Sequence, residues 1–194
     1  MTILYIIIAL VAVVFLWFIG GYNGFVRLRT RAEEAWADID VQLKRRYDLI
    51  PNLVSTVKGY ASHEQGTFDA VTQARAAATQ MHVDVGDITP EAMQAMAGAE
   101  ASLTQSLGKL LAISENYPDL KANENFKELQ RELSDTENKI QAARRFYNGN
   151  VRDLNMKTDM FPSNIIANIF GFKKKDFFDL EDSQEQRENV KVEF

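Results

Sequence analysis

The chain of 194 residues contains no cysteine and only two histidines, His63 and His82. Without cysteine it has neither a disulfide nor a thiolate metal site. Glu64 follows His63, but the zinc-binding pattern HExxH needs a second histidine where this chain has Thr67. The sequence also lacks a Glu-x-x-His pair and a glycine-rich phosphate loop. These absences predict no metal, no other cofactor and no catalytic residue.

One route to an enzyme remains in the sequence, a cluster of carboxylates inside a helical bundle. Glu100, Glu115 and Glu137 are its candidates, and they would make the protein a metal-dependent or hydrolytic enzyme. Salt bridges to arginine are the commoner outcome for such residues. We therefore keep the enzyme as the alternative hypothesis and favour a protein without enzymatic activity.

The chain also lacks an excess of positive charge. It has 22 Lys and Arg against 27 Asp and Glu, a net charge of -5. Short basic clusters such as residues 44–46 and 173–175 are typical of solvated faces, so the balance argues against nucleic acid as a partner.

Residues 2–20 contain no charged side chain. As a helix they would span about 28 Å, close to the ~30 Å hydrocarbon core of a bilayer. A cleaved signal peptide would need a basic start and a small-x-small cleavage site, and neither is present. We interpret residues 2–20 as a retained single-pass membrane anchor, which contacts membrane lipid.

The charges that flank this segment predict its orientation. No Lys or Arg precedes it, whereas Arg27, Arg29 and Arg31 follow it closely. The positive-inside rule places the N-terminus outside and the C-terminal domain in the cytoplasm. The expected location is the bacterial cell (inner) membrane.

Four segments after the anchor repeat apolar residues at helical spacing. The first meets Pro51, where the sequence predicts either a kink or the start of a second helix, which would extend to about residue 80. The third runs from Pro90, with Thr89 as its cap, to about residue 116, and the fourth from about residue 123 to about 156. The seam of the fourth is a clean heptad of Phe126, Leu133, Ile140, Tyr147 and Leu154.

This pattern predicts an all-α protein. An N-terminal transmembrane helix is followed by an elongated antiparallel bundle of about four long helices and a short C-terminal amphipathic helix. We divide the chain into an anchor (1–21), a bundle (22–160), an aromatic amphipathic segment (161–178) and an acidic tail (179–194).

The aromatic segment contains a short apolar helix, with Ser163 placed to cap it and Gly171 placed to end it. Two placements are open for this segment. The aromatic residues beside Lys173–Lys175 would lie at an anionic membrane surface, or the helix would fold back and close the end of the bundle. We favour the second, with these residues packed on the bundle: Ile165, Ile166, Ile169 and Phe170.

Polar residues occupy seam positions and helix ends, where they form a candidate interaction or register network. Hydrogen bonds among them would fix helix register, as a core Asn does in coiled coils, or some of them would face another copy of the chain. We favour register. The candidates are Arg45, Arg46, Tyr47, Asp48, Asn52, Asn116, Tyr117, Asn138, Arg144, Tyr147 and Asn148.

The amino-acid sequences of several stretches resemble those of the LemA family. They are IDVQLKRRYDLIPNLV at 39–54, VKGYASHE at 57–64, Ala74-Arg75, ENYPDLKAN at 115–123, TENKI from 136, ARRFYN from 143 and FPSNIIANIFGF from 161. The resemblance covers the anchor and nearly all of the soluble part. It implies a membrane-anchored bundle with no established reaction, associated with a membrane zinc metalloprotease of the HtpX type.

The sequence thus predicts a non-enzymatic interaction or scaffold protein that works with such a protease in envelope quality control. Tethering to one plane raises the effective concentration of copies and favours self-association. Gly20, Gly21 and Gly24 would let helices of neighbouring copies approach closely. We therefore expect a homo-oligomer with cyclic symmetry.

Overall fold

The computed structural model describes residues 1–81, 83 and 88–178. This part contains no strand, so the predicted all-α fold is confirmed. His82 and the predicted acidic tail lie outside the described residues. The helices are α1 (Thr2–Lys58), α2 (Gln65–Gln80), α3 (Pro90–Ser114), α4 (Pro118–Ala122), α5 (Glu124–Asp159) and α6 (Ser163–Phe170).

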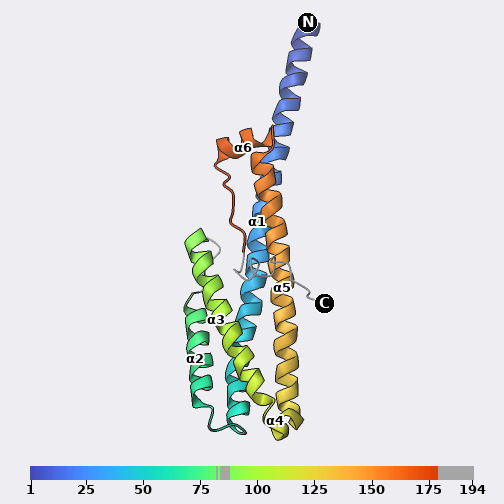
Figure 1. Cartoon of the computed structure of the whole chain (residues 1–194). Coiled ribbons are helices and arrows are strands. Elements are labelled where there is room, and N and C mark those ends of the chain that lie inside the picture. Colours follow the sequence, from blue (N-terminus) through green and yellow to red (C-terminus); the bar gives the residue numbers. More distant parts are fainter. Residues whose placement is uncertain (82, 84–87, 179–194) are drawn as a thin grey trace, which may run out of the picture.

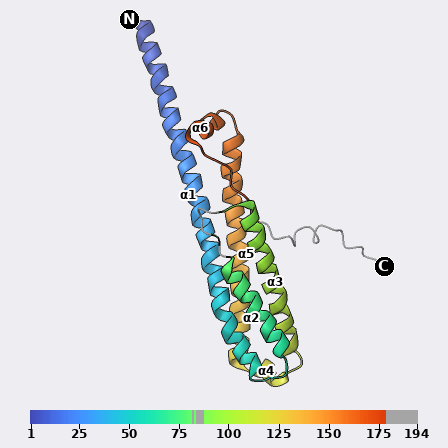
Figure 2. The same cartoon turned by 90° about the vertical axis from the view of Figure 1, so that its left-hand side faces the viewer.

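The helices build an elongated antiparallel bundle (Figure 1). α1 and α5 pack along each other and form the most extensive helix pair, and α2 packs on α3 as a shorter hairpin. This hairpin covers the half of the bundle farther from the N-terminus, and α4 lies at that end (Figure 2). At the opposite end, the first part of α1 projects alone.

α1 is one helix of 57 residues, about 86 Å long. Its N-terminal part is long and apolar enough to cross a membrane, and none of that stretch is buried by the rest of the protein. The predicted boundary between anchor and bundle, after residue 21, falls inside this helix. The bundle is therefore joined to the apolar segment without a flexible linker.

Pro51 lies inside α1 and does not end it, so a second helix does not start there. The break comes after Lys58, and α2 begins only at Gln65. Proline lacks the amide that would bond to the carbonyl of Tyr47, four residues earlier. Arg75 of α2 replaces that donor, because its Nε lies 2.7 Å from the Tyr47 carbonyl oxygen.

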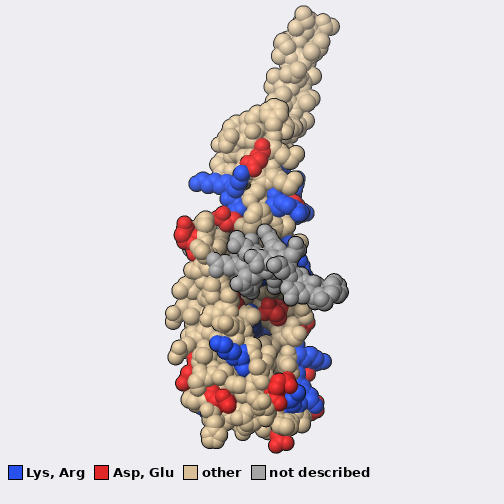
Figure 3. Space-filling model, viewed as in Figure 1, with Lys and Arg blue, Asp and Glu red and all other residues tan. Residues whose placement is uncertain are grey.

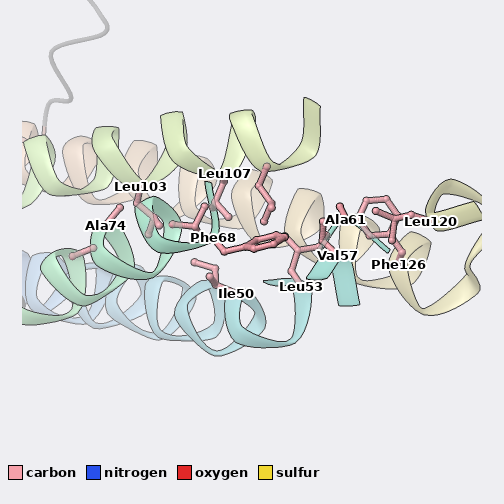
Figure 4. Close-up of a cluster of buried hydrophobic side chains, with 13 residues drawn as sticks. Ile50, Leu53, Val57, Ala61, Phe68, Ala74, Leu103, Leu107, Leu120 and Phe126 are labelled. Atoms are coloured by element: carbon pink, nitrogen blue, oxygen red, sulfur yellow. The ribbon is translucent and has the colours of Figure 1, made fainter. Parts of the chain in front are cut away.

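Three clusters of buried side chains follow one another along the bundle. In the cluster farthest from the N-terminus, Phe68 of α2 lies between Leu53 of α1 and Leu107 of α3 (Figure 4). A middle cluster centres on Trp36 and Tyr147, and a third joins Phe25 to α6. The heptad predicted for α5 supplies all three clusters: Phe126, Ile140, Tyr147 and Leu154 are buried, and Leu133 is half-buried.

The predicted helix ends are confirmed at Thr89, whose side chain accepts a hydrogen bond from the Ala92 amide, and at Gly171. Gly171 ends α6 with φ 69°, in the left-handed region that favours glycine. The predicted capping role of Ser163 is wrong. Its hydroxyl oxygen lies 2.7 Å from the Lys157 carbonyl oxygen and 2.8 Å from that of Met160, so its single proton is donated to the carbonyls that end α5.

α6 folds back onto the bundle, as favoured from the sequence, but through fewer residues than predicted. Ile166 is fully buried, whereas Ile165, Ile169 and Phe170 remain exposed. After α6 the chain runs back along the bundle as residues 172–178, which we call the return segment. It ends at Phe178, whose buried ring lies 5.7 Å from that of Trp36.

Candidate functional site

A buried ionic network occupies the middle of the bundle and centres on Arg46 of α1, which is 4% exposed. Its Nη1 lies 3.1 Å from Oε2 of Glu137 on α5 and 3.4 Å from Oε2 of Glu100 on α3. Its Nη2 donates to the hydroxyl of Thr104 at 2.6 Å. One guanidinium thus connects three helices and faces two carboxylates.

Tyr47 extends this network, because its hydroxyl donates to Oε1 of Glu100. Thr104 also donates its own hydroxyl proton to the backbone carbonyl of Glu100, at 2.9 Å. Oε1 of Glu100 therefore accepts a hydrogen bond from Tyr47, whereas its buried Oε2 has the Arg46 guanidinium as an ionic partner but no hydrogen bond. The network joins α1 to α3 and α5, which is the arrangement that the predicted role in helix register requires.

Burial perturbs the pKa values of two groups in this network, Glu100 and Tyr47. It raises the pKa of Glu100, an effect that the Tyr47 hydrogen bond and Arg46 oppose and that Glu137 reinforces. Burial and the neighbouring Glu100 carboxylate raise the pKa of Tyr47, so this phenol stays protonated at neutral pH. Burial therefore favours the protonated form of the Glu100 carboxyl.

Arg144, Tyr147 and Asn148, also predicted as site residues, hold the return segment. Tyr147 donates its hydroxyl to the carbonyl of Asp176 at 3.0 Å, and burial raises its pKa to about 12. Asn148 exchanges two hydrogen bonds with the backbone of Phe178, at 2.8 and 3.0 Å. The guanidinium of Arg144 lies 5.0 Å from the Phe178 ring. The predicted residues therefore separate into two groups, at Arg46 and at the return segment.

The remaining predicted site residues join neither group. Tyr117 is half-buried beside the apolar cluster around Leu120, and Asn138 is exposed at the edge of the groove described below. The others are exposed at the surface of the bundle: Arg45, Asp48, Asn52 and Asn116.

Sequence reasoning missed Thr104 and Asn155. Asn155 binds the Lys175 backbone with two hydrogen bonds, at 2.8 and 2.9 Å, just as Asn148 binds Phe178. The seven-residue spacing of the two asparagines on α5 was a readable signal for a shared role. Glu100 also follows Met96 by four residues and precedes Leu103 by three, which is the spacing of one buried helix face.

Glu100, Glu115 and Glu137 do not form one carboxylate cluster. Glu115 is exposed and pairs with Lys121 at 2.6 Å, whereas the other two face Arg46. Across residues 1–81, 83 and 88–178, no three His, Cys, Asp or Glu side chains gather in a way that would hold a metal ion.

A groove of about 450 Å³ lies beside the network, between α3 and α5. Leu107, Leu111 and Leu133 form its apolar part, and Arg46 and Glu137 reach its wall. The face seen in Figure 3 is hollowed between these two helices, with charged side chains visible inside. Gly108 also lines it, and no atom lies within 4 Å of the position that a Cβ would take there.

Comparison with known proteins identifies the family. The sequence profile of the LemA family matches residues 35–194, which include the whole network and the groove. The chain belongs to the LemA family. The match begins inside α1, so the apolar segment that precedes it is not part of the family match.

Curated relatives of this LemA-family chain include magnetosome proteins. Magnetosome protein MamQ of Magnetospirillum gryphiswaldense and MamQ 2 of Paramagnetospirillum magneticum are each 25% identical over 174 residues. The match covers 81% of this chain and 64% of each relative, so the chain spans less than two thirds of their length. Protein LemA of Metamycoplasma hominis is 27% identical over 150 residues, with 77% of this chain and 65% of that protein covered.

Proposed function

We propose that this protein is a non-enzymatic, membrane-anchored interaction protein whose bundle presents the groove between α3 and α5 to other membrane proteins. The observation that carries this proposal is the continuity of α1. The same helix contains the apolar segment and supplies Arg46 at the wall of the groove. A site that is built into its own anchor has a fixed position relative to the bilayer.

That position follows from helix geometry. Arg46 lies 26 residues after Gly20, which corresponds to about 39 Å along α1. A membrane partner would therefore need a soluble part that extends about 40 Å from the bilayer surface. By the positive-inside rule this side is the cytoplasm of a bacterial cell, since the arginines follow the apolar segment.

The groove suits a helix of a partner protein. Its leucines offer an apolar floor, and Glu137, whose side chain is 41% exposed, places a carboxylate at the wall. An amphipathic helix with a basic residue beside its apolar stripe would complement both features. The family resemblance suggests a membrane metalloprotease of the HtpX type, in envelope quality control, as the partner.

We further propose that the protein is a homo-oligomer. Val41 of α1 is an exposed apolar side chain on the bundle and is available for lateral contacts. Two of the three glycines predicted to mediate such contacts have internal roles instead. A Cβ at Gly21 would lie 2.2 Å from Cδ1 of Ile166, and one at Gly24 would lie 2.0 Å from Nζ of Lys157.

Two matched variants test the groove as the binding site. Gly108→Trp fills the groove, whereas Gly98→Trp places the same side chain elsewhere on α3, also where no atom lies within 4 Å of a new Cβ. Both changes replace a helix glycine and so raise helix propensity alike. Full-length protein is purified in detergent from native membranes, and the captured membrane proteins are quantified.

We expect wild type and Gly98→Trp to capture the same partner and Gly108→Trp to lose it. Equal capture by both variants would place the binding site elsewhere. Metal analysis of the same preparations addresses the alternative enzyme, because a stoichiometric metal ion would contradict a purely interacting protein.

A further inference from the structure

α6 and the turn before it expose apolar side chains at the end of the bundle from which α1 projects. Phe161 is 79% exposed and Ile169 is 61% exposed, with Ile165 and Phe170 also exposed. Residues 160–172 contain no charged side chain. An exposed apolar patch of this kind on a folded protein marks a site of interaction with another protein or with a membrane.

The opposite face of α6 fixes its position on α1. Ile166 and Ala167 are fully buried with Phe25 and Leu154. The Cδ1 atom of Ile166 lies so close to Gly21 that any side chain there would collide with it. α6 is therefore held against α1 at the point where the apolar segment ends.

Aromatic contacts extend this junction toward the N-terminus. The Phe170 ring lies 4.8 Å from that of Tyr22 and 6.3 Å from that of Phe18. α6 thus lies at the level of residues 18–25 of α1. Figure 1 shows it across the end of the bundle rather than along it.

This level coincides with the edge of a bilayer. Residues 2–20 span about 28 Å, so a membrane centred on them would end near Gly20. An apolar groove of about 440 Å³ continues from this part of α1 onto α6, lined by Val11, Val14, Phe15, Phe18, Ile19, Tyr22 and Phe170. The apolar surface of the anchor and that of α6 are consequently continuous.

Basic residues lie just beyond the expected edge of the bilayer, on the side of the bundle. Arg27, Arg29 and Lys157 follow within the next turns of α1 and α5, and Lys173–Lys175 follow α6 directly. Figure 3 shows Lys and Arg side chains below α6, with Asp and Glu side chains beside them, and Lys174 and Lys175 pair with Asp159 and Glu33. Cations next to the hydrocarbon edge are typical of segments that contact lipid headgroups.

We infer that α6 is an in-plane membrane helix, with lipid acyl chains covering Phe161, Ile165 and Ile169 and filling the groove beside Phe170. The bundle then contacts the bilayer at two places, through α1 and through α6. A single helix leaves rotation about its axis unrestrained, whereas a second contact fixes the direction in which the groove between α3 and α5 faces. This inference holds whether or not that groove binds a partner.

The absence of cysteine allows a direct test in the full-length protein, since each single-cysteine variant carries one thiol. Ile165→Cys and Ile169→Cys are labelled with an environment-sensitive fluorophore and reconstituted in liposomes that contain either plain or doxyl-labelled phospholipid. Phe146→Cys on α5 is the matched control, because Phe146 is apolar and 57% exposed and precedes Asp159, the last residue of α5, by 13 residues, about 20 Å along the helix. Asn168→Cys provides a position on α6 outside the apolar face.

We expect labels at 165 and 169 to show blue-shifted emission, strong quenching by doxyl lipid and protection from aqueous iodide. Labels at 146 and 168 should show the reverse. Iodide quenching at 165 and 169 equal to that at 146 would overturn the inference. Protection from iodide without doxyl quenching would also overturn it, because protein rather than lipid would then cover the helix.

Discussion

Arg75 donates a hydrogen bond from its Nε to the carbonyl oxygen of Tyr47, 2.7 Å away. Tyr47 precedes Pro51 by four residues, so this is the carbonyl that Pro51 leaves without an amide donor. A side chain of α2 thus completes the hydrogen bonding of α1. The helix continues through the proline because its neighbour supplies the missing donor.

We predict that Arg75→Ala lowers the free energy of unfolding by about 1 to 2 kcal/mol, since it leaves the Tyr47 carbonyl unpaired. Denaturant unfolding of the full-length protein in detergent measures this change. In a Pro51→Ala background the missing amide is restored, so the same substitution should cost less than about 0.5 kcal/mol. An equal cost in both backgrounds would mean that Arg75 acts through other contacts.

Stability should depend on pH through Glu100. Burial raises the pKa of this carboxyl, so the folded protein binds its proton more tightly than the unfolded chain does. The resulting stabilisation is complete below the ordinary carboxyl pKa and is lost as pH rises through the higher folded pKa. Relative to Glu100→Gln, the wild type should therefore gain unfolding free energy as pH falls from about 7 toward about 5.

Unfolding curves for both proteins over this pH range show whether the difference in unfolding free energy grows as pH falls. Gln has nearly the shape of Glu and does not titrate, so common effects of pH cancel in the difference. A difference that shrinks as pH falls would contradict the account of Glu100.

The return segment should open when either asparagine that binds it is shortened. Asn148→Ala or Asn155→Ala removes two hydrogen bonds to the backbone of residues 172–178. We expect trypsin to cleave after Lys173–Lys175 about ten-fold faster or more, because cleavage follows the population of the open form.

Asn150→Ala is the matched control, since Asn150 lies on the same helix and donates only to the nearby Phe146 carbonyl. Its cleavage rate should equal that of the wild type. Unchanged cleavage in Asn148→Ala and Asn155→Ala together would show that apolar contacts alone hold the segment.

Orientation in the membrane gives a further prediction. Arginines follow the apolar segment and no Lys or Arg precedes it, so a reporter fused after Phe194 should be active only on the cytoplasmic side. Protease added to intact cells should leave the C-terminal end uncleaved. Cleavage there, with a cytoplasmic marker intact, would reverse the proposed topology.

Periodicity and helix-end residues predicted most of the fold. The seam of α5 and the ends at Thr89 and Gly171 followed from local rules of packing and capping. The behaviour of Pro51 did not, because the compensating donor is Arg75, 28 residues along the chain from Tyr47. Local rules describe what a residue removes from its own helix and not what a neighbouring helix supplies.

Only part of the candidate site was predicted, because its contacts also join residues that are far apart in the chain. Arg46 stood out because a charge in an apolar seam needs partners, and arginine salt bridges were favoured for Glu100 and Glu137, but the sequence alone did not show that both carboxylates face this one arginine. Tyr147 and Asn148 were predicted as polar residues of the network. Their hydrogen bonds to the return segment depend on how residues 172–178 pack along α5. Such long-range pairings are set by the tertiary fold.

Site-specific photocrosslinking in living cells tests whether the groove between α3 and α5 binds another membrane protein. A photoreactive residue is placed at position 108, inside the groove, or at position 98, elsewhere on α3. We expect a discrete adduct with a membrane protein from position 108 and none from position 98. Adducts of equal yield from both positions, or none from position 108, would contradict this expectation.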